Sequence, residues 1–214
     1  MPLIQIMKND KNEEKKIFYS QIPKTGGTSI IKFFYDNFRT NIFYFRESKI
    51  CDAFIFPTQH MHANIFNEVI NFEKLTYAFT IVRHPIDRII SEYYHANKNN
   101  NKPDNINDWF NKIYIKLLQN PSINENHFRK QIDFVNDKIK VFKFEDCINK
   151  IIKLILKDNN LLIENHYDID HLRNRNEIIK KNVNLEKNIK FNLETTKTIF
   201  NYYEDDFISF KYDY

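Results

Sequence analysis

The sequence is poor in glycine: it has two glycines in 214 residues, Gly26 and Gly27, and they are adjacent. Globular proteins contain ~7% glycine on average, so the other turns of this chain must be built from other residues. Glycine is needed where φ is positive or where a Cβ atom would block the close approach of another group. The surroundings of the pair favour the second reason, a backbone that approaches a ligand.

Cysteine and long apolar runs are also scarce. Cys51 and Cys147 belong to no CxxC pattern, so we expect two reduced, buried thiols of a cytosolic protein. No apolar run approaches the ~20 residues that a membrane span needs. The N-terminal stretch is too short and too soon followed by charge to read as a signal peptide. The expectation is a cytoplasmic chain without a transmembrane segment.

The remaining composition predicts one domain, residues 1–214, with residues 1–15 as a polar lead-in. The 20 Phe and 12 Tyr residues predict a core packed on aromatic rings. A net charge of +4 and a pI near 8.8 suit an anionic cofactor or acceptor, but the Lys-rich composition gives the same figures and makes this support weak. No nucleic-acid partner is expected, and the sequence does not define the oligomeric state.

Strands and helices alternate along the chain, which predicts an α/β fold with a mostly parallel central sheet and helices on both faces. The expected strands are 3–6, 16–20, 41–45, 52–56, 75–82 and 138–144. Helices are expected from the glycine pair to 39, from 62 to 71, from 85 onward, over 107–119, in part of 122–132, over 145–157 and over 192–203. Trp109 falls in the apolar pattern of a helix and is expected in the core.

The glycine pair lies in the segment 22–29, Ile-Pro-Lys-Thr-Gly-Gly-Thr-Ser, between a predicted strand and a predicted helix. A helix start offers backbone N–H groups and a positive dipole end to an anion. Lys24 adds an ammonium group, and Thr28 and Ser29 add hydroxyl groups. A plain turn would need at most one glycine and no lysine, so the segment predicts a phosphate-binding loop.

ATP- and GTP-binding loops of the Walker A type have the form GxxxxGK[ST], in which the lysine follows the glycines. In this chain Lys24 precedes Gly26 and Gly27, and no apolar strand ends in an Asp that would serve as a Walker B carboxylate. An ATP-dependent kinase or a nucleotide-binding module with a non-Walker loop is therefore the alternative hypothesis.

The order Pro-Lys-Thr-Gly-Gly-Thr-Ser resembles the 5′-phosphosulfate loop of sulfotransferases that use 3′-phosphoadenosine 5′-phosphosulfate (PAPS). A second motif of that family is an Arg at the end of a central strand and a Ser along the next helix, which hold the 3′-phosphate. Arg83 and Ser91 have that spacing. The resemblance implies a P-loop NTPase-like fold and donor contacts from Lys24, Thr25, Gly26, Gly27, Thr28, Ser29, Arg83 and Ser91.

Segments 126–135, 141–146 and 202–212 resemble the carbohydrate sulfotransferases, with the greatest likeness to heparan sulfate 2-O-sulfotransferase. That likeness depends on His60-Met61-His62 and on His171-Leu172-Arg173. The chain departs from the pattern in its Gly-Gly loop, in the Gln-His-Met-His sequence and in lacking the membrane anchor of the Golgi enzymes. The resemblance therefore implies the chemistry and leaves the acceptor open.

The two histidines are the candidate bases. In extended backbone, residues two apart point to the same side, so both rings are expected to face one pocket. His62 matches the base of the family and stands ahead of His60. Zinc would need three or four ligands, and no third ligand has a suggestive spacing, so no metal is expected. A polar surface pair is the other alternative.

The expected function is sulfuryl transfer from PAPS to a hydroxyl of a carbohydrate or glycoconjugate, leaving adenosine 3′,5′-bisphosphate. His62 is expected to take the hydroxyl proton and Lys24 to stabilise the leaving phosphate. Arg173 is expected at the 3′-phosphate, although a solvated basic loop explains Arg173 and Arg175 equally well. His127 and Gln131 are candidates for the acceptor cleft, and nothing local requires that role.

Overall fold

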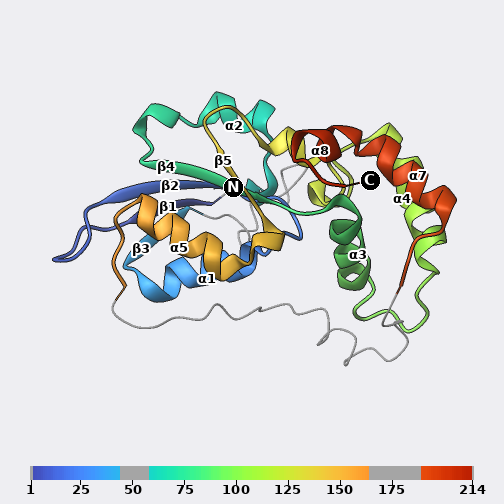
Figure 1. Cartoon of the computed structure of the whole chain (residues 1–214), viewed down its shortest axis with the longest axis horizontal. Coiled ribbons are helices and arrows are strands. Elements are labelled where there is room, and N and C mark those ends of the chain that lie inside the picture. The colour runs from blue at the N-terminus through green and yellow to red at the C-terminus, as the bar shows by residue number, and fades with distance from the viewer. Residues whose placement is uncertain (1, 44–57, 164–188, 214) are drawn as a thin grey trace.

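A computed structural model of the chain describes residues 2–43, 58–163 and 189–213. It is a mixed α/β structure in which a five-stranded sheet is flanked by helices (Figure 1). The strands are β1 (Leu3–Ile6), β2 (Lys15–Ser20), β3 (Thr40–Phe43), β4 (Tyr77–Val82) and β5 (Lys140–Lys143). Among the described residues, no helix combines the length and the apolar character needed to cross a bilayer.

The sheet has the order β3-β1-β2-β4-β5. Strand β2 pairs in parallel with β4, and β4 pairs in parallel with β5, as the sequence predicts. Strand β1 instead runs antiparallel to both β2 and β3. The short connection 7–14 between β1 and β2 accounts for this difference, because a parallel neighbour would need a longer crossover. The expected mostly parallel sheet is thus mixed on the β1 side.

The helices form two groups. Helices α1 (Gly27–Asn37) and α5 (Ile148–Asp158) cover one face of the sheet, and α2 (Ala63–Val69) covers the other (Figure 1). Helices α3 (Pro85–Ala96), α4 (Ile106–Gln119), α7 (Leu193–Tyr202) and α8 (Glu204–Ser209) pack together beyond the ends of the central strands. Short 3-10 turns lie at Thr58–His60, Phe72–Lys74, Ile123–Asn126, Gln131–Phe134 and Phe144–Asp146.

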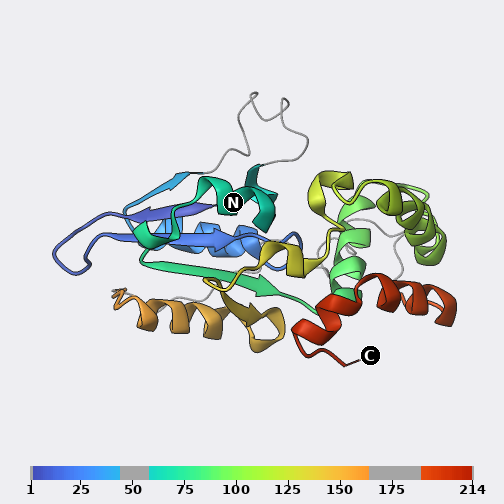
Figure 2. The same cartoon turned by 90° about the horizontal axis from the view of Figure 1, so that it is seen from above.

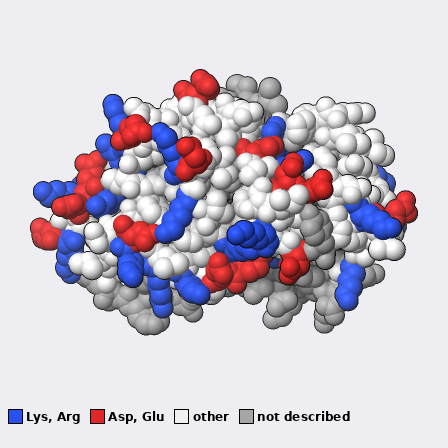
Figure 3. Space-filling model, turned by 45° about the horizontal axis from the view of Figure 1, so that its top comes forward, with Lys and Arg blue, Asp and Glu red and all other residues white. Residues whose placement is uncertain are grey.

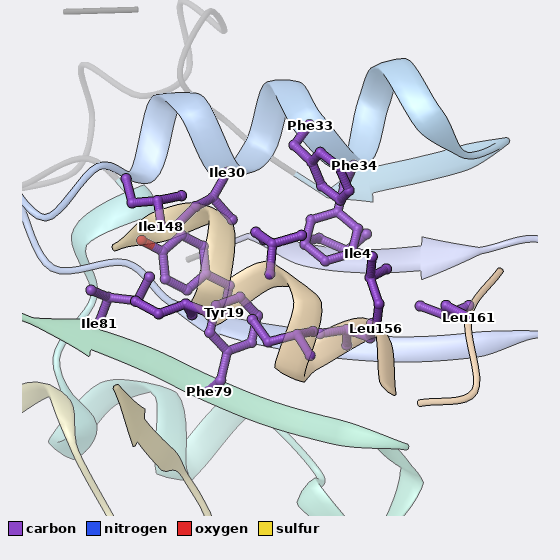
Figure 4. Close-up of a cluster of buried hydrophobic side chains, with 14 of the residues drawn as sticks. Ile4, Tyr19, Ile30, Phe33, Phe34, Phe79, Ile81, Ile148, Leu156 and Leu161 are labelled. Atoms are coloured by element: carbon purple, nitrogen blue, oxygen red, sulfur yellow. The ribbon is translucent and has the colours of Figure 1, made fainter. Parts of the chain in front are cut away.

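The main core combines aromatic rings with a larger number of isoleucines and leucines, so the aromatic core expected from the composition is present only in part. Tyr19 and Phe79 from neighbouring strands stack with ring centroids 4.6 Å apart, and Phe34 of α1 is fully buried near them (Figure 4). Stacked and edge-to-face ring pairs of this kind stabilise a core beyond the burial of their area. The isoleucines of α5, a helix distant in sequence from these strands, complete the cluster.

Two other predictions need correction. The helical stretch expected in part of 122–132 is present as short 3-10 helices and not as an α-helix, because Asn124 and Glu125 both have positive φ angles. Cys147 is exposed and does not lie in the core, since it occupies the turn just before α5 with φ 70°. The expected strand 52–56 lies outside the described residues, as does Cys51.

The glycine pair is explained by contacts within the chain. Gly26 has φ +88°, a left-handed conformation that costs an L-residue with a side chain roughly 1–2 kcal/mol. Gly27 has no such angle, but a Cβ atom there would lie 2.6 Å from Nε2 of Gln21. Backbone conformation at one glycine and side-chain packing at the other therefore exclude other residues, and neither explanation needs the ligand that the sequence favoured.

We expect Gly26→Ala to lower the free energy of unfolding by ~1–2 kcal/mol, because alanine must adopt the left-handed conformation. The Cβ atom would also displace Cδ1 of Ile148, 2.5 Å away. Urea unfolding followed by circular dichroism measures the change. Tyr35→Ala on the exposed face of α1 is the control and should stay within ~0.5 kcal/mol of the unmutated protein. Equal stability of Gly26→Ala and the unmutated protein would contradict the explanation.

Candidate functional site

The two sequence motifs meet at the carboxyl ends of β2 and β4. Because these strands are parallel neighbours, the loop after β2 and the turn after β4 emerge at the same edge of the sheet, facing α3 (Figure 2). Ligands of open α/β sheets bind at this kind of edge. A guanidinium nitrogen of Arg83 donates to the carbonyl of Lys24 at 3.3 Å. The structure thus joins two motifs that lie far apart in the sequence.

The loop after β2 ends at the start of α1. Gly26 is the residue before the helix, and Gly27, Thr28 and Ser29 form its first turn. The first N–H groups of a helix lack partners inside it, so they and the positive end of the dipole favour an anion. The Thr25 hydroxyl, which is fully buried, donates to the carbonyl of Ile22 at 2.9 Å and stabilises the loop from within. This geometry fits a phosphate group.

Arg83 is held by two other segments. Its backbone N–H donates to Oε1 of Gln131 at 2.9 Å, and Nε2 of Gln131 donates to its carbonyl at 2.8 Å. The guanidinium carbon of Arg83 lies 4.5 Å from the centre of the Phe144 ring. Gln131, a candidate acceptor residue in the sequence, is fully buried and instead fixes the backbone of Arg83. Ser91 is half-buried on α3, which follows Arg83 directly.

Lys24 contacts a buried carboxylate, Glu92, which the sequence offers only as a fallback base in case neither His60 nor His62 has that role. Its Nζ lies 3.9 Å from Oε2 of Glu92, the residue after Ser91 on α3. The same oxygen lies 2.8 Å from Nδ1 of His127, and Oε1 of Glu92 lies 3.8 Å from Nδ1 of His95. We call these four residues the Glu92 cluster: Lys24, Glu92, His95 and His127.

The electrostatics of the cluster keep Glu92 ionised. Burial alone would raise the pKa of Glu92, but the neighbouring imidazoles of His127 and His95 and the positive charge of Lys24 hold this pKa well below its usual range. Glu92, His95 and His127 are close enough together for a divalent cation. We read them as an ion-pair network and not as metal ligands, because the Lys24 ammonium already supplies the positive charge at Glu92.

His60 and His62 have different neighbours. His60 lies in a 3-10 turn, so the alternation expected of extended backbone does not apply. It is buried, its Nδ1 lies 3.1 Å from the carbonyl of Gln21, and its ring meets that of His127 edge-on at 5.2 Å. A carbonyl only accepts, so Nδ1 of His60 carries the hydrogen.

The pKa values of both histidines are lowered, for different reasons. For His60 the largest cause is burial of the ring. For His62, the half-buried residue that precedes α2, the causes are burial and the charge of Arg129, which Asp133 partly offsets. His60 therefore adjoins the Glu92 cluster, whereas His62 is influenced by the segment 129–133.

Some site residues could have been found in the sequence and others could not. Glu92 and His95 are three residues apart on a predicted helix that already carries Ser91, which places them on one face. His127, a candidate for the acceptor cleft in the sequence, has no comparable local signal for its contact with Glu92, because it follows a turn of residues with positive φ angles. Arg173, Arg175 and His171 lie outside the described residues.

The sulfotransferase family model matches residues 10–213, nearly the whole chain, and the chain belongs to this family. The match agrees with the meeting of the loop and Arg83 at one edge of the sheet. No curated protein and no solved structure matches the chain significantly.

The lowered pKa of His60 predicts a loss of stability in acid. Below the ordinary imidazole pKa of ~6.5 the unfolded chain binds a proton that the folded chain refuses. The free energy of unfolding should therefore fall as the pH falls from 7.5 to 5.5, by at most ~1.4 kcal/mol per pH unit for this group.

Urea unfolding at several pH values measures this slope. His60→Asn keeps a donor near Nδ1 and cannot titrate, so its slope should be shallower than that of the unmutated protein. His62→Asn reports the contribution of the half-buried histidine in the same way. An unchanged slope in His60→Asn would contradict the assignment.

Proposed function

We propose that this protein transfers a sulfuryl group from PAPS to a hydroxyl group of a carbohydrate or glycoconjugate. The observation that carries the proposal is the meeting of the Lys24–Ser29 loop with Arg83 at the carboxyl ends of two parallel strands. Membership of the sulfotransferase family supports sulfuryl transfer in general and disfavours the kinase alternative. The parallel strands β2, β4 and β5, with a phosphate loop between β2 and α1, support a P-loop-like arrangement.

The donor would be held at both of its phosphate ends. Backbone N–H groups from Gly26 to Ser29 and the ammonium of Lys24 would bind the 5′-phosphosulfate. Arg83 and Ser91 would bind the 3′-phosphate, and the contacts of Arg83 with Gln131 and Phe144 fix its position beforehand. Preorganised contacts of this kind keep a donor in line with the attacking oxygen.

The transfer itself needs a proton acceptor and a cation. A histidine takes the hydroxyl proton as the oxygen attacks sulfur, and we assign this role to His62, with His60 as the second candidate. The lowered pKa of His62 keeps its imidazole unprotonated near neutral pH, which is the state that a base requires. Lys24 stabilises the negative charge that develops on the leaving phosphate.

The acceptor class rests on the resemblance of the middle and C-terminal segments to carbohydrate sulfotransferases. On the face shown in Figure 3, positive and negative side chains are interspersed. The modest net charge of +4 favours an acceptor of modest negative charge, such as an oligosaccharide or a lipid-linked saccharide, over a densely charged polymer.

Donor selectivity tests the role of Arg83. Calorimetry should give tight binding of adenosine 3′,5′-bisphosphate and weak binding of 5′-AMP. Arg83→Ala should remove most of this preference, weakening bisphosphate binding roughly 10- to 100-fold, because a charged hydrogen-bond partner is lost. Arg39→Ala changes an exposed arginine just beyond the C-terminal end of α1 and should keep the preference. Equal affinities of the unmutated protein for the two nucleotides would refute the donor assignment.

A transfer assay tests the function directly. The protein is incubated with ³⁵S-labelled PAPS and a panel of glycans, phenols and tyrosine peptides. Label should appear on a glycan. Label only on phenols or peptides would contradict the carbohydrate acceptor and leave sulfuryl transfer intact, whereas no label on any acceptor would count against the transfer itself.

Transfer to the acceptor found in that assay is then measured in variants of Lys24, His60 and His62, which separates their roles. Lys24→Ala should lose transfer and weaken nucleotide binding, whereas Lys32→Ala on the exposed side of α1 should do neither. His62→Ala should lower the transfer rate by a factor of roughly 10²–10⁴ and bind the bisphosphate almost normally. If His60→Ala abolishes transfer and His62→Ala does not, the base is His60.

A further inference from the structure

Glu92 forms the centre of a charge network that joins three segments of the chain. It is buried on α3, and its Oε2 atom contacts both Nζ of Lys24 in the phosphate loop and Nδ1 of His127 in the turn after 123–126. That turn is tied to the segment of His60, because Asn126 donates to the His60 carbonyl at 2.9 Å. Glu92 is therefore shared by Lys24 of the loop and by His127, whose turn is attached to the segment of His60.

In the structure, the positive charge of Lys24 balances the negative charge of the Glu92 carboxylate. Glu92 is ionised and Lys24 supplies one positive charge. Within the part of the chain that the structure describes, the imidazoles of His95, His127 and His60 also face the cluster. The low pKa of His60 keeps that ring neutral. Nearby, the guanidinium of Arg88 donates to the His127 carbonyl, and that of Arg83 donates to the Lys24 carbonyl.

Donor binding would change this balance, and this step rests on the proposed function. The proposed donor brings several negative charges to the loop, and Lys24 is the residue proposed to contact them. One ammonium cannot fully neutralise both the phosphosulfate and Glu92. An ionised carboxylate that loses its counter-charge in a buried position is strongly disfavoured. Another cation is therefore needed beside Glu92.

His127 can supply that cation without a rearrangement of the backbone. Its Nδ1 is already at hydrogen-bond distance from Glu92, so Nδ1 carries a hydrogen and Nε2 is the nitrogen that can gain one. Imidazole is the side chain that gains or loses a proton near neutral pH. His95, whose Nδ1 lies 3.8 Å from the other oxygen, is a more distant second partner.

We propose that Glu92 is a positioning residue of the donor site, which holds Lys24 before the donor binds and a protonated His127 afterwards. Binding of the donor, or of the product nucleotide, then takes up a proton from solvent onto Nε2 of His127. Nucleotide affinity should consequently fall as the pH rises above 7, by up to tenfold per pH unit for one linked proton.

Calorimetry with adenosine 3′,5′-bisphosphate tests the proposal without an acceptor. Titrations at pH 7.5 in HEPES and in Tris, whose ionisation enthalpies differ, give the number of protons exchanged. At this pH the phosphates of the nucleotide, with a second pKa of ~6, are almost fully ionised and contribute little. We expect the unmutated protein to take up roughly half a proton or more per nucleotide bound.

Matched variants test whether the proton that is taken up binds to the Glu92–His127 pair. Glu92→Gln removes the negative charge and His127→Asn keeps a donor near Nδ1 but cannot titrate, so both should bind the nucleotide with little proton uptake. His95→Asn should keep most of the uptake. Asp87→Asn, an exposed carboxylate on the same helix, should keep all of it. Circular dichroism of each variant checks that it is folded.

Failure of the Glu92 proposal and failure of the proposed function would give different results. Normal nucleotide binding without proton uptake in the unmutated protein would overturn the role of Glu92 and leave the proposed function standing. The same holds if uptake persists in both Glu92→Gln and His127→Asn. Absence of any nucleotide binding would instead refute the donor assignment itself.

Discussion

The parallel pairing of β2 with β4 is the constraint on which the candidate site depends. The register aligns Ser20 with Thr80, and the Thr80 hydroxyl donates to the Ser20 carbonyl at 2.7 Å. This pairing sets the Lys24–Ser29 loop beside the turn that carries Arg83. A slip of one residue would turn the side chains of β4 to the opposite faces of the sheet and break the ring stack of Tyr19 and Phe79. The core and the site are therefore fixed by the same strand contact.

Buried polar groups then set the positions of the site residues at this edge. Gln131 fixes the backbone of Arg83, and Glu92 joins Lys24 to His127. Each of these contacts links segments distant in the sequence, and removal of one member takes a hydrogen-bond or ion-pair partner from a buried group. This explains why a small site draws on the loop after β2, the turn after β4, α3 and the segment 123–134.

The local pattern of residue types along the sequence predicted much of this structure. The apolar strand at Tyr77–Val82, the helix after Pro85 and the loop at Gly26 all follow from residue types that admit few alternatives. Contacts between distant segments could not be predicted in the same way. The antiparallel β1, the roles of Glu92 and Gln131, and the separation of His60 from His62 depend on tertiary packing, which neither periodicity nor spacing encodes. Sequence resemblance supplied the class of chemistry, and the geometry supplied the partners of each residue.

The central claim is that this edge of the sheet binds a nucleotide with phosphates at both ends and needs no metal to do so. A thermal shift experiment compares adenosine 3′,5′-bisphosphate with ATP and Mg²⁺, each at increasing concentration. Bisphosphate at ~100 times its dissociation constant should add ~2.7 kcal/mol of stability and raise the Tm clearly. The ATP–Mg²⁺ complex should leave the Tm almost unchanged. A large shift with ATP–Mg²⁺ and none with the bisphosphate would contradict the account.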